Sequence, residues 1–510
     1  MTAEAPADPN RWLITASIML ATVMTSLDAT IANVALPHMA GALSASADEI
    51  TWVLTSYIIA SAVMMPMSGW LARRVGRKRV FMISIIGFTL TSALCGAAGD
   101  LSQIVVFRLL QGAFGAALIP LSQAVLLDIY PPEEFGSAMA IWGMGVVAGP
   151  ILGPVLGGWL TDNFSWRWVF YINLPLGALA FTGVFKFIHN RDGGAKTRFD
   201  FPGFLLLGVA IGGLQLMLDR GSDKAWFESS EIWIEATVAG LALVLFIIHT
   251  MTADRPFLPR ALAKDVNFVA ASLFGFSLGV MLFSTMALLP PMLQTLLDYP
   301  VTTAGLVLAP RGLGGLVSMY LVGQLVRVVD MRLILLIGLI VCVFALYLMT
   351  GFSLLMEARL PIISGVIQGL GMGVLMVPLS GLAFATLSPS LRDDGASVFT
   401  LVRNLGGSVG ITIMQALHSQ NSQIVHARLT EQLRPDNPLA RPPWMSSVFS
   451  LTDPAGLERL NNEVNRQASM VAYVDDYRVM LFLTLGMMPL LLLMRPPRKT
   501  GPDDAHLVAE

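Results

Sequence analysis

Four ionisable side chains lie well inside apolar stretches of the sequence: Asp28, Arg108, Arg311 and Arg403. A charged group is costly in a membrane interior, and one that is kept there is usually functional. Asp28 is predicted to be the only acid well inside an apolar stretch. Three other acids fall at the ends of such stretches: Asp128, Asp162 and Asp219. Desolvation favours a protonated carboxylate, and a nearby guanidinium favours an ionised one. An acid and a cation in these places therefore predict that Asp28 binds and releases protons.

Long apolar segments must position these groups. The chain has 510 residues, of which 55% are hydrophobic and 13% charged, whereas soluble proteins carry roughly 25% charged residues. An all-α integral membrane protein is therefore predicted. Fourteen apolar runs have about the 20 residues that span a bilayer as a helix, and they lie near 12–36, 50–70, 79–98, 102–127, 139–160, 168–188, 201–219, 232–250, 267–292, 302–326, 333–353, 360–386, 396–418 and 477–494.

Basic residues orient these 14 predicted transmembrane helices. An even number of spans places both termini on one side. The short loops on that side carry nineteen Lys and Arg residues, against four in the short loops on the other side. Because positive residues concentrate in cytoplasmic loops, both termini are predicted to be cytoplasmic. The first ten residues lack the basic region and cleavage site of a signal peptide, so the first run is predicted to be retained.

Asp28 and Arg108 are predicted at a similar depth. Asp28 lies nine residues before Pro37 on a helix that runs outward, and Arg108 lies six residues after Ser102 on a helix that runs inward. At 1.5 Å per residue, both lie roughly 10 Å below the external surface. We expect external protons to bind Asp28 and release substrate, and deprotonation toward the cytoplasm to readmit substrate. The alternative is a permanent ion pair that only holds the helices together.

The two ends of the chain repeat one another. Gly69–Arg73 after the second run matches Gly323–Arg327 after the tenth, at an offset of 254, and Gln111-Gly112 matches Gln368-Gly369 at an offset of 257. Chance recurrence is the alternative. Two six-helix halves related by a parallel repeat are typical of rocking transporters, which bind substrate between the halves.

The repeat divides the chain into three predicted domains. Residues 1–190 form an N-terminal six-helix half, and residues 191–252 form an inserted pair, helices 7 and 8. Residues 253–510 form the C-terminal half, which includes an external segment at 419–476.

Two glycine-containing motifs flank the predicted core. The loop after the second run contains Gly69, Arg73, Gly76 and Arg77; its glycines permit tight turns and its cations suit the cytoplasmic face. A simple positive anchor is the alternative reading. The fifth run carries glycines four residues apart, with two prolines that bend the helix: Gly145, Gly149, Pro150, Gly153, Pro154, Gly157 and Gly158. Such a bare stripe lets another helix approach closely, and we expect the tenth run there; a generic packing motif is the alternative.

Together these motifs resemble the major facilitator superfamily. The loop at Gly69–Arg79 resembles the signature loop of that family, although Arg73 stands where the family usually has an aspartate. The Gly-Pro and Gly-Gly pairs of the fifth run resemble its antiporter motif, which favours export over uptake. Four further segments are similar to the fourteen-helix drug:proton antiporters, and most similar to EmrB-type exporters of Gram-negative bacteria: Leu27–Pro37, Arg108–Gly112, Ser165–Pro175 and Arg403–Gly407.

The resemblance implies a proton-coupled antiporter that exports small hydrophobic drugs across the inner membrane, driven by the proton gradient without a cofactor. Asp28 and Arg108 are the proton-coupling candidates. The substrate-binding candidates are polar motif residues and the remaining arginines: Asn33, Gln111, Arg311, Arg403 and Asn404. The 28 methionines suit a cavity that accepts varied apolar ligands. A dedicated metabolite or siderophore exporter and a non-transporting membrane sensor are the alternatives.

Other classes of protein find no support in the sequence. There is no Gly-rich loop ending in Lys-Ser or Lys-Thr, so ATP drive is not expected. The six histidines and two cysteines form no closely spaced metal cluster, and no enzyme is predicted. The net charge of −2 gives no reason to expect a nucleic-acid partner.

The external segment from Gln420 to Asp476 is far longer than the other external loops, and long connections usually have a function or are disordered. Apolar residues recur at helical spacing on both sides of a proline-rich middle: Ile424, Leu429 and Leu433 before it, and Leu457, Leu460, Val464, Ala468 and Val471 after it. Two stretches packed together as a small cap are one interpretation. The family resemblance implies the other, a docking site for a periplasmic adaptor of the membrane-fusion kind, itself joined to an outer-membrane channel.

Overall fold

A computed structural model describes residues 10–131, 134–188, 198–326, 328–433 and 453–494. Within these residues the chain is helical and contains no strand. Thirteen helices or joined helices are long and apolar enough to cross a membrane, and a pair bent by 55° brings the number to 14. The predicted all-α class and the count of 14 spans agree with this structure.

The N-terminal bundle spans residues 11–187. Its helices are α1 (Arg11–Leu43), α2 (Ala47–Ile50), α3 (Trp52–Met64), α4 (Met67–Val75), α5 (Arg77–Ala97), α6 (Leu101–Gly115), α7 (Leu118–Ile129), α8 (Phe135–Asn163), α9 (Trp168–Tyr171) and α10 (Asn173–Phe187). The bent span is α3 with α4. Pro66 lies at this bend, and its missing N–H interrupts the helical hydrogen bonds there.

Two helices, α11 (Phe201–Arg220) and α12 (Ser230–Thr252), follow, with the short η2 (Trp226–Glu228) between them. The C-terminal bundle spans residues 266–493. Its helices are α14 (Val266–Pro291), η3 (Met292–Leu296), α15 (Val301–Leu325), α16 (Met331–Met349), α17 (Arg359–Ala385), η4 (Pro389–Leu391), α18 (Arg392–Gln432), α19 (Pro454–Gly486) and α20 (Leu490–Leu493), and the short α13 (Arg260–Lys264) precedes them.

The two bundles pair their helices in the same order. In the N-terminal bundle, α1 packs on α8, α3 on α6, and α5 on both α6 and α10. In the C-terminal bundle, α14 packs on α18, α15 on α17, and α16 on both α17 and α19. The inserted α11 packs on α12, on α3 and on α18, and much of α12 exposes apolar side chains such as Ile234, Leu241 and Ile248. Water would not favour such a surface, so it faces lipid.

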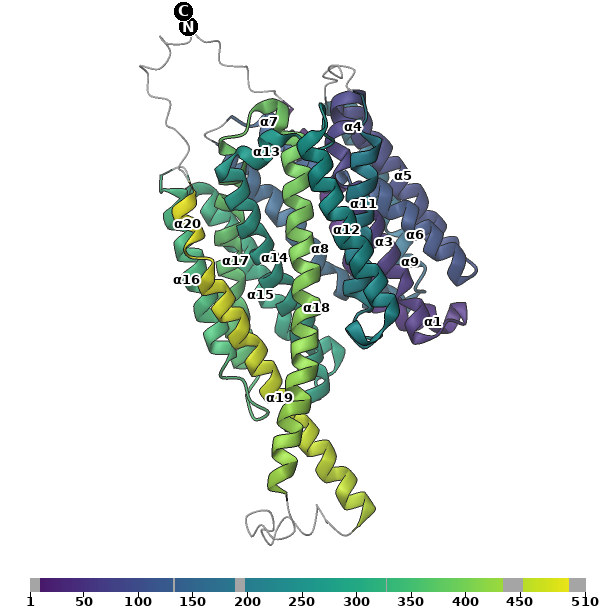
Figure 1. The fold of residues 1–510 in the computed structure, drawn as a ribbon, viewed down its shortest axis with the longest axis vertical. Helices are drawn as coiled ribbons and strands as arrows, with labels where there is room; N and C mark the ends of the chain where they lie inside the picture. Colours follow the sequence, from purple (N-terminus) through teal and green to yellow (C-terminus); the bar gives the residue numbers. More distant parts are fainter. Residues whose placement is uncertain (1–9, 132–133, 189–197, 327, 434–452, 495–510) are drawn as a thin grey trace, which may run out of the picture.

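The last two spans extend beyond the runs predicted from sequence. Figure 1 shows α4, α7, α13 and α20 at one end of the bundle, which the basic loops mark as cytoplasmic, and shows α18 and α19 projecting from the opposite end. The predicted runs 396–418 and 477–494 contain only the apolar parts of these helices. The helical extensions expected on both sides of the proline-rich loop are confirmed, while residues 434–452 of that loop lie outside the described residues.

Candidate functional site

Asp28 lies at the centre of a buried polar cluster in the N-terminal bundle. Its Oδ2 accepts a hydrogen bond from Arg108 Nη1 at 2.7 Å, and its Oδ1 accepts from Gln111 Nε2 at 2.9 Å and from Asn173 Nδ2 at 2.8 Å. Asp28, Arg108, Gln111 and Asn173 are each 0% exposed. Three donors converge on this one carboxylate, so a proton added to it would take the place of a hydrogen bond and the cluster would have to rearrange.

Arg108 is held by more than its carboxylate partner. Its Nε donates to the carbonyl oxygen of Val53 at 3.0 Å, and its Nη1 also reaches Gln111 Oε1 at 2.9 Å. The guanidinium lies over the Tyr57 ring, with its carbon 4.2 Å from the ring centroid. A buried cation needs several such partners to offset its desolvation. This cluster therefore ties α6 to α1 and α3.

Close helix packing brings these side chains together. An added Cβ at Gly112 of α6 would lie 2.4 Å from the Tyr57 carbonyl oxygen of α3, so only glycine permits that approach. Asn173 comes from the start of α10, where its amide also donates to Ser92 Oγ at 3.0 Å. Side chains of α6 and α10 thus meet Asp28 of α1 directly, and α3 and α5 join the cluster through Arg108 and Asn173.

The structure separates the predicted substrate candidates. Gln111 is fully buried and hydrogen-bonds both Asp28 and Arg108, so it belongs to the Asp28 cluster and not to a substrate-binding surface. Asn33 lies exposed on α1, five residues beyond Asp28, and Asn404 is partly exposed on α18. Sequence reasoning missed Asn173 and Tyr57; Asn173 stood in a quoted motif, but nothing in its spacing pointed to Asp28.

Arg311 and Arg403 differ from Arg108 in having no acid partner among the described ion pairs. Arg311 Nη2 and Arg403 Nη1 are shielded from solvent and have no hydrogen-bond partner among the described residues. Arg403 lies 5.6 Å from the centroid of the Trp142 ring, which belongs to the other bundle. A buried N–H without an acceptor is costly, so these two cations offer donors that a bound anion can use.

The glycine stripe of α8 faces α1. The prediction that the tenth span packs against this stripe is wrong. An added Cβ at Gly149 would lie 2.2 Å from the Ser26 carbonyl carbon, and one at Gly153 would lie 2.2 Å from Thr30 Oγ1. Pro150 cannot donate to the Val146 carbonyl oxygen, and the Ser26 hydroxyl donates to that oxygen instead. The tenth span, α15, packs on α8 through other residues, such as Met319 beside Gly143. The stripe thus fixes α8 against the helix that carries Asp28.

Charged residues join the two bundles at the cytoplasmic end. Arg73, which was expected in a loop, lies in the last turn of α4 and pairs with Asp394 at the start of α18. Arg77 pairs with Asp128 and, at 2.7 Å, with Asp393, and Arg392 lies 3.5 Å from Asp128. We call these six residues the cytoplasmic latch. The cation at position 73 takes an acid from the other bundle as its partner, so this pair joins α4 to α18.

Asp476 is a further fully buried acid, which the sequence analysis did not single out. It is 0% exposed and lies on α19, in the joined helix Pro454–Leu493 that contains an apolar stretch long enough to cross a membrane. The sequence prediction began this last span at residue 477 and left Asp476 just outside. Asp393 and Asp394 are also buried, at 5% and 1% exposure, at the cytoplasmic start of α18.

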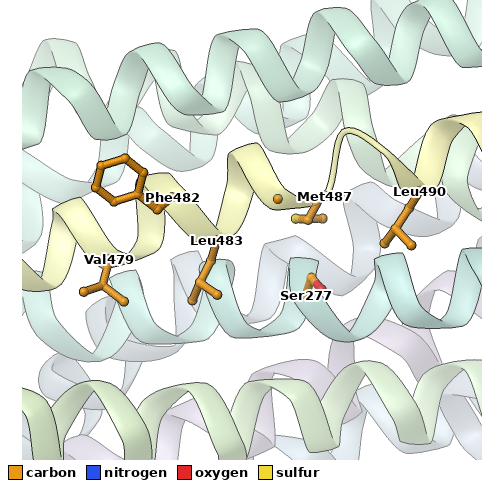
Figure 2. A pocket seen from close by; sticks show the side chains of 7 residues that line it. Ser277, Val479, Phe482, Leu483, Met487 and Leu490 are labelled. Atoms are coloured by element: carbon orange, nitrogen blue, oxygen red, sulfur yellow. The ribbon is translucent and has the colours of Figure 1, made fainter.

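An apolar groove of about 450 Å³ lies on the surface between α14 and the end of α19. Figure 2 shows its wall, with Ser277 opposite Val479, Leu483, Met487 and Leu490. Phe482 and Leu483 are exposed at its edge. The groove belongs to the lipid-facing surface and contains no group of the Asp28 cluster. Among the described residues no group of three His, Cys, Asp or Glu side chains is placed to hold a metal ion.

Comparison with known proteins gives a consistent result. The family model described as Major Facilitator Superfamily matches residues 18–411. The chain is 34% identical to the multidrug export protein EmrB of Haemophilus influenzae, over 95% of this chain and 96% of that protein. It is 35% identical to the fatty acid resistance protein FarB of Neisseria gonorrhoeae, over 96% and 97%.

Solved structures share the fold at low sequence identity. The proton:xylose symporter XylE superposes with a TM-score of 0.59 at 13% identity, over 96% of this chain and 100% of that one. The human organic anion transporter MFSD10 superposes with a TM-score of 0.58 at 14% identity, over 93% and 100%.

Proposed function

The chain belongs to the major facilitator superfamily, and we propose that it is a proton-coupled antiporter that exports small hydrophobic compounds. The matched relatives support drug efflux across the inner membrane, since the EmrB relatives carry the name multidrug export protein. The observation that carries the proton coupling is the buried carboxylate of Asp28, which holds Arg108, Gln111 and Asn173 together.

The cycle follows from what a proton does to this cluster. The ionised Asp28 balances the Arg108 charge and accepts three hydrogen bonds. A proton on Asp28 removes that balance and one acceptor position, so the contacts among α1, α3, α6 and α10 must change. A proton arriving from outside thereby favours one arrangement of the bundle, and its loss to the cytoplasm favours the other. In a static ion pair, by contrast, no such change would accompany transport.

The proposed substrates are hydrophobic compounds that carry a negative charge or a strong hydrogen-bond acceptor. Arg311 and Arg403 support this, because each keeps a shielded N–H without a partner in the described residues. Trp142 lies beside Arg403 and adds an aromatic surface for the apolar part of a ligand. The name of the FarB relative, fatty acid resistance protein, agrees with this class. A dedicated exporter of one such metabolite would use the same groups.

The projecting ends of α18 and α19 support a tripartite arrangement. These helices extend beyond the bundle on the side opposite the cytoplasmic latch (Figure 1). We propose that a periplasmic adaptor of the membrane-fusion kind docks there and leads to an outer-membrane channel.

One experiment tests the proposed function as a whole. Purified protein in vesicles should accumulate an anionic hydrophobic drug against its gradient only when a pH gradient of the correct sign is imposed. Dissipating the gradient with a proton carrier should stop accumulation. Equal accumulation with and without the gradient would contradict the proposal.

A further inference from the structure

We propose that Asp476 is a second proton-binding carboxylate, placed in the C-terminal bundle and connected to the external side through His418 and Ser469. Asp476 Oδ2 lies 3.0 Å from His418 Nδ1, and Ser469 Oγ lies 3.2 Å from His418 Nε2. The Tyr473 ring packs on the imidazole, with the two ring centroids 4.1 Å apart. This inference rests on the proposed proton-coupled export and adds a site to it.

Burial changes in one direction along this chain of contacts. Asp476 is 0% exposed, and its Oδ1 is shielded without a hydrogen-bond partner in the described residues. The His418 side chain is 20% exposed, and Ser469 is partly exposed. The three side chains thus lead from a buried acid with a free acceptor atom to a water-accessible hydroxyl.

The position of the chain along the helices places it at the external surface. His418 lies 26 residues after Arg392, where α18 begins, which is about 39 Å along the helix. The hydrocarbon core is about 30 Å thick. Since α18 starts at the cytoplasmic latch, His418 lies near the external boundary, and Ser469 is seven residues closer to the projecting end of α19 than Asp476.

The order serine, histidine, aspartate also occurs in hydrolytic triads, and the surroundings exclude that use here. All three residues lie inside long helices, whose backbone N–H groups are taken by helical hydrogen bonds. The free backbone donors that stabilise a tetrahedral intermediate are therefore missing at Ser469. A histidine between a buried acid and a partly exposed hydroxyl is suited to passing protons, because its charge changes between about pH 5 and 8.

The charged neighbours favour a role for Asp476 itself. The titratable groups that interact with it are His418 of α18 and Tyr473, Asp475 and Tyr477 of α19. Two cations lie one contact further away, Arg478 beside Asp475 and Arg311 of α15 beside Tyr477. Asp475 is paired with Arg478 at 2.8 Å and is partly exposed. The sequences of α14 and η3 contain no charged residue, and that of α16 contains only Arg332 at its cytoplasmic start. His418 is thus the polar partner that can exchange a proton with Asp476.

Asp476 lies close in sequence to a residue that neighbours a substrate-binding candidate. Tyr477 follows Asp476 directly, and its phenol is close enough to the Arg311 guanidinium for an electrostatic interaction. The phenol also donates a weak hydrogen bond to Met292 at 3.8 Å. Asp476 is therefore the sequence neighbour of a phenol that lies near a cation we propose for substrate binding.

The test measures proton binding directly in the full-length protein. Infrared difference spectra between about pH 5 and 8 report each carboxyl group that gains a proton. We expect Asp476→Asn to remove one carboxyl band, whereas Asp475→Asn, its paired neighbour, leaves the spectrum unchanged. Unchanged spectra in Asp476→Asn would overturn the proposal, whatever the protein transports.

A second variant covers the case in which Asp476→Asn does not fold. His418→Gln should remove the dependence of export on external pH, whereas His426→Gln, which breaks a bond to Asn461 two turns further out, should retain it. A His418→Gln protein with the wild-type external pH profile and the full set of carboxyl bands contradicts the relay. If the wild-type protein shows no pH-driven export, the proposed function is refuted. The infrared bands would still show whether Asp476 binds a proton.

Discussion

Asp28 and Thr285 occupy equivalent places in the two bundles. Gln111 Nε2 donates to Asp28 Oδ1 at 2.9 Å, and Gln368 Nε2 donates to Thr285 Oγ1 at 3.1 Å. Thr285 follows Asp28 by 257 positions, and Gln368 follows Gln111 by the same 257. The glutamine is shared, but only the N-terminal bundle has the acid. The titratable centre of the repeat is therefore one-sided, which agrees with our placing the main coupling step at Asp28.

The glycine stripe predicts a position-dependent effect of one methyl group. Gly149→Ala should lower the melting temperature and reduce export, because the new Cβ would meet backbone atoms of α1 at 2.2 Å. Alanine favours a helix over glycine by about 1 kcal/mol. A lower melting temperature would therefore have to come from the contact of the new Cβ with α1. Gly158→Ala is the matched control, since its nearest neighbour would be Val34 at 3.9 Å. Equal melting temperatures for the two variants would show that α1 can move aside.

The cytoplasmic latch predicts rescue by charge exchange. Arg73→Asp should reduce export about tenfold, equivalent to about 1.4 kcal/mol, because it places two acids together where Arg73 and Asp394 now pair. The double variant Arg73→Asp with Asp394→Arg should recover most of the activity in vesicles. Arg79→Asp, at an exposed position in the first turn of α5, controls for loss of positive charge. If the double variant exports no faster than Arg73→Asp alone, the pairing of Arg73 with Asp394 does not support export.

The unpaired arginines predict a change in substrate preference. Arg403→Gln should weaken binding of an anionic drug about tenfold or more, as expected when a charged hydrogen bond of about 1.5–3 kcal/mol is lost. Binding of a neutral drug of similar size should change little, because Trp142 remains beside the site. Fluorescence titration with the two drugs measures both constants. Equal losses for both would indicate a structural role for Arg403.

The projecting helices predict a defect seen only in intact cells. Replacing residues 431–459 with a short Gly/Ser linker removes the outer parts of α18 and α19 but retains Val464 and Ala468, which are buried. Export in vesicles should persist, while an adaptor no longer co-purifies and drug resistance is lost. An adaptor that still co-purifies at the normal yield would place the docking surface elsewhere.

The sequence predicted most of the fold because the determinants are local or periodic. Apolar length predicted the spans, and basic loops gave their orientation. The last helix shows where this reasoning fails, since the two acids Asp475 and Asp476 at the edge of an apolar run made the helix look shorter than it is. The stripe was recognised, but spacing cannot tell which helix lies against Gly149. Asn173 was missed because its contact with Asp28 joins residues 145 positions apart.

The most direct measurement of the central claim compares two kinds of transport in Asp28→Asn. The amide has nearly the same shape as the carboxylate but cannot titrate. We predict that the variant in vesicles exchanges labelled for unlabelled drug across the membrane, yet fails to accumulate drug against its gradient when a pH gradient is imposed. Asp162→Asn, at an exposed position at the end of α8, should accumulate drug as the wild type does. Accumulation by Asp28→Asn at the wild-type level would contradict the proposed coupling through Asp28.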